Sequence, residues 1–276
     1  MNRSEKGAHV RVNGIRQHYL HFPGPGPQVL IVPGIVSPAM LWSHVGAWLS
    51  QRYDCYILDV RGRGLSEAGP HLDYGADACA ADLIAFVQAL DLQQVIVVGH
   101  SMGGRIAVRA AARAPQSLGA VVMVDPPMSG PQRRAYPVPK SRTIDLLLAA
   151  HRGQAMQAIQ NSPARPWPED LQNLRAQWLS TCDERAVHVT YDDFHQQDVF
   201  ADIAQVARPL SLLCAGTGGV VSDEDITEIH GLQKDLFVTR LAATGHQMQA
   251  EDFEAFKPAL DEHLARHVHT LKEGRN

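Results

Sequence analysis

This chain of 276 residues has neither a long apolar run nor an excess of positive charge. No apolar run approaches the ~20 residues that a helix needs to cross a bilayer, so we expect no membrane association. The formal net charge of -4 offers no basic field for nucleic acid, and we expect no such partner. The polar stretch Met1–Lys6 runs directly into a strand pattern, which is unlike a secretory signal and favours a cytoplasmic location.

Cysteine is also scarce, and its spacing excludes two kinds of site. The four cysteines, none of them in a Cys-x-x-Cys pair, are Cys55, Cys79, Cys182 and Cys214. This pattern predicts buried free thiols in a reducing compartment rather than disulfides or a zinc site. His263, His267 and His269 lie on a helical run without a nearby acidic or thiolate cluster. We interpret them as a solvated helix face, and we expect no metal and no other cofactor.

What the chain does have is a regular alternation of short apolar runs and amphipathic segments. The expected strands are residues 9–12, 15–20, 29–32, 55–58, 95–98, 121–124, 210–215 and 236–241. The expected helices are residues 42–49, 74–90, 106–114, 225–232 and 253–267. Such alternation predicts an α/β fold with a mostly parallel sheet and helices on both faces. The turn Asn13-Gly14 predicts an antiparallel hairpin at its start.

One long segment interrupts this rhythm. Residues 128–206 are rich in proline and contain helical patterns near 143–159 and 171–179, but no strand pattern. A helical insertion between two sheet strands predicts a cap over the carboxyl edge of the sheet. The expected organisation is therefore a core of residues 1–127 and 207–276 with a cap of residues 128–206.

The most specific motif follows the strand at 95–98. It reads Gly99-His100-Ser101-Met102-Gly103 and leads directly into an alanine-rich helix. A Gly-x-Ser-x-Gly turn between a strand and a helix holds its serine in a strained conformation with the hydroxyl exposed above the sheet. We predict Ser101 as a nucleophile, although the same residue could be a simple helix N-cap.

A serine nucleophile needs a base, and one histidine is suitably placed. Thr244-Gly245-His246 follows the last expected strand, so its loop returns to the sheet edge that carries Ser101. We predict His246 as the base; the alternative is a loop histidine bonded to solvent.

With these motifs the chain resembles the α/β-hydrolase fold family over nearly its whole length. The supporting residues are the serine turn, Pro33-Gly34-Ile35 after a strand, the loop Asp59–Ser66 and the late Gly245-His246. The resemblance implies that Arg61 anchors loops rather than substrate. It also implies an oxyanion hole formed by the N–H groups of Met102 and Ile35. Most relatives have histidine where this chain has Pro33.

The acid of the expected triad departs from the usual family pattern. Relatives usually have it in a Gly-x-x-Asp turn, which here reads Gly216-Thr217-Gly218-Gly219. Some relatives instead place the acid after the strand that follows the nucleophile helix, and that position is Asp125. We predict Asp125, which would orient His246 and stabilise its charged form. Asp223 and Glu224 remain alternatives, and Asp125 could be only a turn residue.

With a serine nucleophile and the acid at position 125, the chain resembles hydrolases that act on products of ring degradation. The expected reaction is hydrolysis of an N-formyl amide bond in a small-molecule substrate. A carboxylesterase or carbon–carbon bond hydrolase would use the same triad. A cofactor-free dioxygenase of this fold would use the histidine and the acid, and a receptor-like or scaffolding member would need none of the three residues. Nothing in the sequence indicates an oligomeric state.

The expected substrate carries a carboxylate, for which arginine is a suitable partner. The basic residues closest in sequence to Asp125 include Arg133, Arg134 and Arg142. We predict that one of these three arginines binds the substrate carboxylate. Other candidate basic residues in the cap are Lys140, Arg165, Arg175 and Arg185, and possible cavity walls are Tyr136, Trp167, Trp178 and His195.

Overall fold

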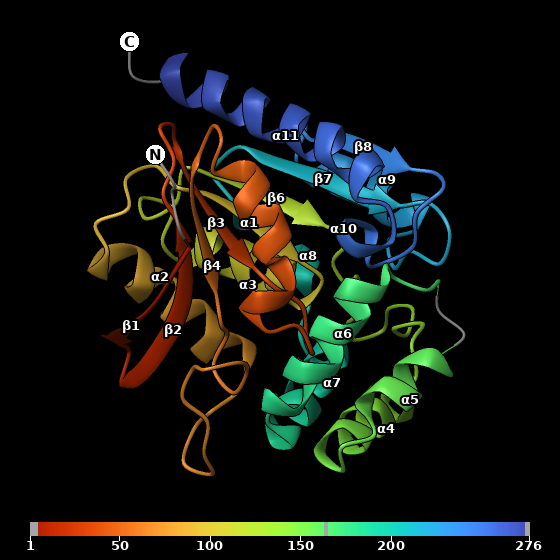
Figure 1. Ribbon diagram of the computed structural model, residues 1–276. Helices are drawn as coiled ribbons and strands as arrows, with labels where there is room; N and C mark the ends of the chain where they lie inside the picture. Colours follow the sequence, from red (N-terminus) through yellow and green to blue (C-terminus); the bar gives the residue numbers. More distant parts are fainter. Residues whose placement is uncertain (1–4, 163–164, 274–276) are drawn as a thin grey trace.

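A computed structural model describes residues 5–162 and 165–273 of the chain (Figure 1). Its strands are β1 (Lys6–Val12), β2 (Ile15–Phe22), β3 (Gln28–Val32), β4 (Asp54–Leu58), β5 (Ile96–His100), β6 (Ala120–Val124), β7 (Leu210–Ala215) and β8 (Phe237–Leu241). Its α-helices are α1 (Ser43–Leu49), α2 (Ala76–Ala89), α3 (Met102–Arg113), α4 (Lys140–His151), α5 (Ala155–Gln160), α6 (Glu169–Trp178), α7 (Glu184–Gln196), α8 (Val199–Gln205), α9 (Asp223–Leu232), α10 (Met248–Glu251) and α11 (Phe253–Glu273). Two 3₁₀ turns are η1 (Ala39–Trp42) and η2 (Leu179–Thr181).

All eight of these strands form one sheet in the order β1-β2-β4-β3-β5-β6-β7-β8. The pairs β1–β2 and β2–β4 are antiparallel, and every later pair is parallel. The predicted α/β class and the initial hairpin are confirmed. Because the parallel strands end at one edge, the loops after β3, β5, β6 and β8 meet there.

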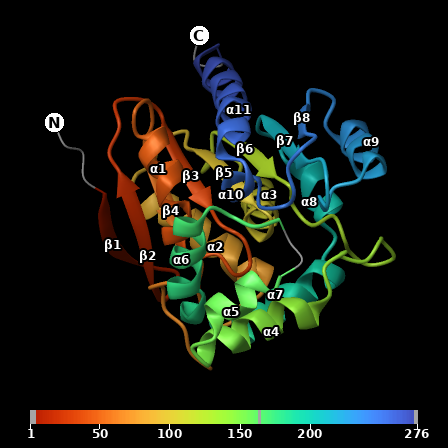
Figure 2. The ribbon, with the colours of Figure 1, turned by 45° about the vertical axis from the view of Figure 1, so that its right-hand side comes forward.

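Helices cover both faces of the sheet, and the alternation of side chains along each strand explains why. Along β5, Val97 packs with the apolar residues of α2, α3 and α8, whereas Ile96 and Val98 pack with those of α1 and α11. A strand that is buried on both faces is expected to be largely apolar. β6 is apolar at every position, and β5 is apolar up to its last residue, the buried His100. Figure 2 shows α11 crossing one side of the molecule, opposite the group formed by α4 to α7.

Between β6 and β7 the described residues contain helices and loops but no strand, and the helices differ from the expected ones. The helical pattern expected near 143–159 forms two helices, α4 and α5, because Gly153 adopts a φ of +74° between them. Helices α7 and α8 were not predicted individually. Asp183 and Asp198 accept hydrogen bonds from the first turns of these helices, so two N-cap signals were present in the sequence.

The interpretation of the C-terminal histidines was wrong for two of the three. His263 and His267 are buried and both hydrogen-bond the hydroxyl of Ser211 on β7, each at 2.8 Å. Only His269 lies on the exposed side of α11. The helix presents these two histidines to the sheet, where one serine hydroxyl satisfies a nitrogen of each. The prediction of buried free cysteines is confirmed for all four.

Candidate active site

Ser101 stands at the junction of β5 and α3, in the backbone conformation that such a turn requires. Its φ of +52° and ψ of -119° lie outside the regions that L-residues prefer. The surrounding structure maintains the strain: the Ser101 N–H donates to Val124 O at 2.9 Å, and the Ser101 carbonyl accepts from Gly104 N–H at 2.9 Å.

Close backbone approach explains the two glycines of the motif. A Cβ on Gly99 would overlap the carbonyl of Gly103, and a Cβ on Gly103 would overlap the carbonyl oxygen of Val32. Strand β3, strand β5 and the start of α3 are therefore packed backbone to backbone. This packing presents Ser101 at the sheet edge.

The structure brings Ser101, His246 and Asp125 into one hydrogen-bonded chain. His246 Nε2 lies 3.0 Å from Ser101 Oγ, and His246 Nδ1 lies 2.7 Å from Asp125 Oδ2. Because a carboxylate can only accept, Nδ1 carries the proton and Nε2 is free to accept the hydroxyl proton of Ser101. The His246 side chain is 16% exposed and that of Asp125 is 0% exposed. The hydrogen-bonded chain therefore runs from a partly exposed imidazole to a fully buried carboxylate.

Asp125 follows β6 and is shut away from solvent, yet each of its carboxylate oxygens has a donor. Oδ1 accepts from Ala215 N–H at 3.2 Å, and Oδ2 accepts from Val220 N–H at 3.1 Å as well as from His246. A buried carboxylate is costly unless hydrogen bonds replace its water. These donors flank the glycine-rich turn Gly216-Thr217-Gly218-Gly219, where relatives usually carry their acid.

The alternative acids stand elsewhere. The Asp223 side chain is 89% exposed and pairs with Arg240 at 2.8 Å. Glu224 is exposed beside it in the first turn of α9. The helix that carries both begins at Asp223 and directs them to solvent rather than to His246.

Two residues that sequence reasoning missed hold the His246 loop. His100 Nε2 donates to the carbonyl of His246 at 2.9 Å. Burial lowers the pKa of His100 to about 3, with the neighbouring His246 as a second cause, so its ring is a neutral donor. Glu251 accepts from the N–H groups of Gly245 at 2.6 Å and Gln247 at 3.1 Å. The signal for His100 was its place inside the serine turn.

The expected oxyanion donors lie on either side of Ser101. Met102 is the first residue of α3, where a helix leaves its N–H without an intrahelical partner. The Gly34-Ile35 turn lies against the serine, since a Cβ on Gly34 would come within 3.3 Å of Ser101 Cβ. The buried Arg63 donates from Nε to Ile35 O at 3.1 Å, which fixes this peptide. Arg61 binds Asp82 and the Asp73 carbonyl, so its predicted anchoring role is confirmed.

A cavity of about 520 Å³ opens over Ser101 and His246. Its walls include Ile35 from the β3 turn, Tyr136 and Arg142 from the segment after β6, and Arg175 from α6. Tyr136 lines this cavity together with Ser101, and burial raises the pKa of this tyrosine. Tyr136 was expected only as a possible wall.

Two of the three predicted carboxylate-binding arginines do not line this cavity. Arg133 stacks on Phe200 of α8 at 3.7 Å and pairs with Glu228 at 2.8 Å. Arg134 pairs with Asp225 at 2.6 Å and donates to the Val220 carbonyl. Proximity in sequence was misleading here, because acidic residues of α9 draw both side chains outward.

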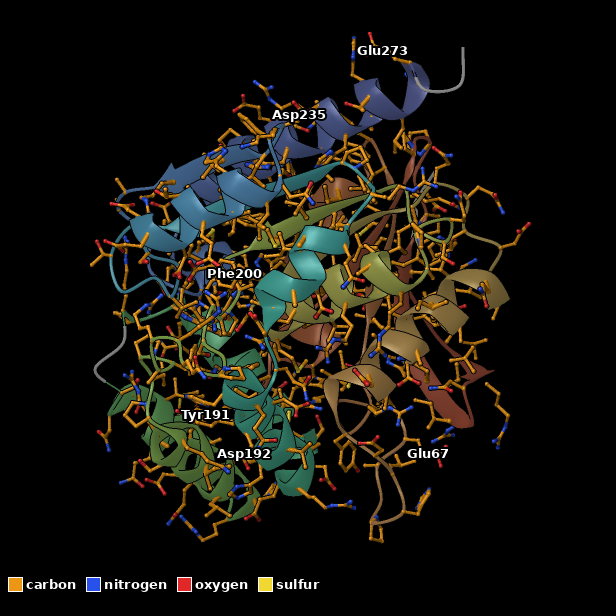
Figure 3. The ribbon with its side chains drawn as sticks, turned by 180° about the vertical axis from the view of Figure 1, so that it is seen from behind. Glu67, Tyr191, Asp192, Phe200, Asp235 and Glu273 are labelled. Atoms are coloured by element: carbon orange, nitrogen blue, oxygen red, sulfur yellow. The ribbon has the colours of Figure 1, made fainter. Side chains whose placement is uncertain are left out.

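Lys140 of α4, another candidate basic residue, pairs with Asp192 of α7 at 2.7 Å. Figure 3 labels Asp192 together with its neighbour Tyr191 and with Phe200 of α8.

In residues 5–162 and 165–273, no group of three or more histidine, cysteine or acidic side chains is arranged to hold a metal ion. No helix in those ranges has the length and apolar character to span a bilayer.

Comparison with known proteins agrees with this geometry. A profile of the α/β-hydrolase fold matches residues 27–253. The chain is 44% identical to the N-formylmaleamate deformylase of Pseudomonas putida over 258 residues, which are 94% of this chain and 96% of that protein.

Solved structures are similar as well. An N-formylmaleamic acid deformylase of Pseudomonas putida S16 superposes with a TM-score of 0.88 at 42% identity, covering 93% of this chain and all of that one. An esterase of Exiguobacterium antarcticum has a TM-score of 0.80 at 17% identity, covering 94% of this chain and 100% of that chain, and shows the fold alone. The profile match and the 44% identity together place the protein in the α/β-hydrolase fold family.

Proposed function

We propose that the protein is a serine hydrolase that converts N-formylmaleamate and water to maleamate and formate, the deformylation step of nicotinate catabolism. The single observation that carries the chemistry is the hydrogen-bonded chain from Ser101 through His246 to Asp125, open to a cavity at its serine end. The choice of substrate is supported by the 44% identity to a deformylase of that name along almost the whole chain.

The first half of the reaction forms a formyl-enzyme. Ser101 Oγ attacks the formyl carbon while its proton passes to His246 Nε2, and the negative charge develops on the formyl oxygen. The N–H groups of Met102 and Ile35 stabilise this oxyanion. His246 then gives the proton to the departing amide nitrogen, and maleamate leaves. Asp125 stabilises the imidazolium throughout.

The second half releases formate. A water molecule gives a proton to His246 and attacks the formyl ester of Ser101. The tetrahedral intermediate collapses when His246 returns the proton to Ser101 Oγ, which restores the hydroxyl. One water is consumed for each formate released, and no cofactor takes part.

The experiment is incubation of the purified protein with N-formylmaleamate, with formate and maleamate measured together. We expect equal amounts of both products, and a formyl adduct on Ser101 in rapidly quenched samples by mass spectrometry. Parallel assays with p-nitrophenyl esters, ring-cleavage diones and a hydroxyquinolone under oxygen test the esterase, carbon–carbon hydrolase and dioxygenase alternatives. Turnover of one of these without formate release from N-formylmaleamate would refute the proposed substrate.

A further inference from the structure

Arg175 of α6 lies on the wall of the cavity, and it forms no ion pair with any acidic side chain that the structure describes. Its guanidinium stacks on the Trp167 ring at 4.5 Å, and both side chains line the space over Ser101. Within residues 5–162 and 165–273, the Arg175 Nε is buried and has no hydrogen-bond partner. A buried arginine donor without an acceptor costs free energy. We therefore expect a ligand in the cavity to supply the acceptor for this Nε.

The charges around Arg175 strengthen this reading. Burial, and next to it the positive charge of Arg142, lower the pKa of Arg175 to about 10. Arg142 lines the same cavity and donates to Ser162 Oγ at 3.3 Å. The acid in the cavity lining, Glu251, is already held by two backbone N–H groups.

Other arginines near the cap differ from Arg175 in this respect. Arg133 and Arg134 pair with acids of α9, and Arg109 pairs with Asp77 and Asp202. Arg175 is therefore stabilised by an aromatic ring, but its charge is left for something that enters the cavity.

We propose that Arg175, assisted by Arg142, forms an anion subsite that binds a carboxylate of a small ligand in the cavity. Helix α6 packs against η1, which follows the Gly34-Ile35 turn, so the subsite and the expected oxyanion donors belong to adjoining walls. Identification of the ligand's carboxylate with that of N-formylmaleamate rests on the proposed function. The anion subsite itself does not.

The test compares two small ligands that differ in charge, by calorimetric titration of the intact protein. Maleate is the anionic ligand, and maleamide, its uncharged diamide, is the matched control. We expect maleate to bind at least tenfold more tightly than maleamide. Arg175→Met should weaken maleate binding about 10- to 100-fold, the range for loss of a charge-assisted hydrogen bond. Arg175→Lys should have a smaller effect, because it keeps the charge but loses the planar fork.

Arg152→Met is the matched control variant. Arg152 follows α4, is exposed and does not line the cavity, so its substitution should change neither binding nor activity. If Arg175→Met fails to fold, as judged by circular dichroism, Arg142→Met and Arg175→Lys supply the same comparison. Equal affinity for maleate and maleamide, or maleate binding that is unchanged in the Arg175 and Arg142 variants, would overturn the subsite.

A formate assay on the same preparations separates the two proposals. Arg175-dependent maleate binding without formate release from N-formylmaleamate would retain the subsite and reject the substrate. Formate release with maleate binding independent of Arg175 and Arg142 would do the reverse. If both proposals hold, the ratio of kcat/KM for N-formylmaleamate to that for a neutral formamide falls at least tenfold in Arg175→Met.

Discussion

At the scale of single residues, the candidate site depends on which atom of each side chain is free to act. His246 binds Asp125 through Nδ1, so its Nε2 is free to accept the proton of Ser101. His100 uses Nε2 to bind the His246 backbone, so it is committed as a support. Two adjacent imidazoles therefore have different tasks because they have different partners.

Removal of the serine hydroxyl or the imidazole should abolish turnover without unfolding. We expect Ser101→Ala and His246→Ala each to lower kcat by ~10³-fold or more, because the two groups act as a unit. Formate release is the measurement, and thermal unfolding is the control for folding. Activity within tenfold of the unsubstituted protein in either variant would contradict the assignment.

The acid assignment can be tested against its alternatives. Asp125→Asn should lower kcat by ~10³-fold, because an amide cannot stabilise the imidazolium and can orient the wrong tautomer. Asp223→Ala and Glu224→Ala should retain most activity, since both side chains are exposed. The opposite ranking in the same formate assay would return the acid to the usual position in the family.

The hydroxyl of Tyr136 should contribute more modestly. It lines the cavity with Ser101, and its raised pKa keeps it protonated at neutral pH, so it can donate to the reacting atoms of a bound substrate. We expect Tyr136→Phe to lower kcat about tenfold with a smaller change in KM, as for the loss of one hydrogen bond to the reacting atoms. A change confined to KM would show that this ring only shapes the cavity.

At the scale of elements, the junction of β5 and α3 tolerates no added atoms. Gly103→Ala would place a Cβ against the Val32 carbonyl oxygen of β3, where neither backbone can move without disrupting the sheet. We expect a loss of about 3 kcal/mol or more in the free energy of unfolding, measured by urea titration.

Gly231→Ala is the matched control for that substitution. Gly231 lies near the end of α9, and a Cβ there would meet nothing within 4 Å. Alanine should raise the free energy of unfolding by about 0.5 to 1 kcal/mol, because it loses less conformational entropy in a helix. Similar losses in both variants would mean that close backbone packing is not the cause.

At the scale of the whole molecule, buried neutral histidines should make the protein sensitive to acid. Burial lowers the pKa of His263 to about 3 and that of His267 to about 4, and His100 behaves likewise. In the unfolded chain, histidine has a pKa of about 6.5. Below pH ~6.5 the unfolded state therefore binds protons that the folded state does not, and stability falls.

As the pH falls from ~6 to its folded pKa, each of these histidines should lower the free energy of unfolding by up to about 1.4 kcal/mol per pH unit. Urea unfolding at several values from pH 7.5 to 4.5 measures this slope. We expect a shallower slope in the double variant His263→Gln, His267→Gln. His269→Gln is the control, since His269 is exposed and should not alter the slope. An unchanged slope in the double variant would contradict this account.

Features that depend on neighbouring residues could be predicted from the amino-acid pattern alone. Alternating apolar runs define the strands, and the glycines around Ser101 define the turn, because hydrophobic period and backbone freedom are properties of neighbouring residues. The placement of Ser101, His246 and Asp125 at one edge also followed, since parallel strands end together. The triad roles of these residues remain proposals.

Which distant side chains meet depends on the three-dimensional packing of the chain. It drew Arg133 and Arg134 to the acids of α9 and buried His263 and His267 against Ser211. It also left the Arg175 Nε on the cavity wall without a partner among the residues that the structure describes. The local pattern around an arginine or histidine in an amphipathic segment does not indicate its partner. The partner depends on how helices pack across the fold, which sequence spacing does not encode.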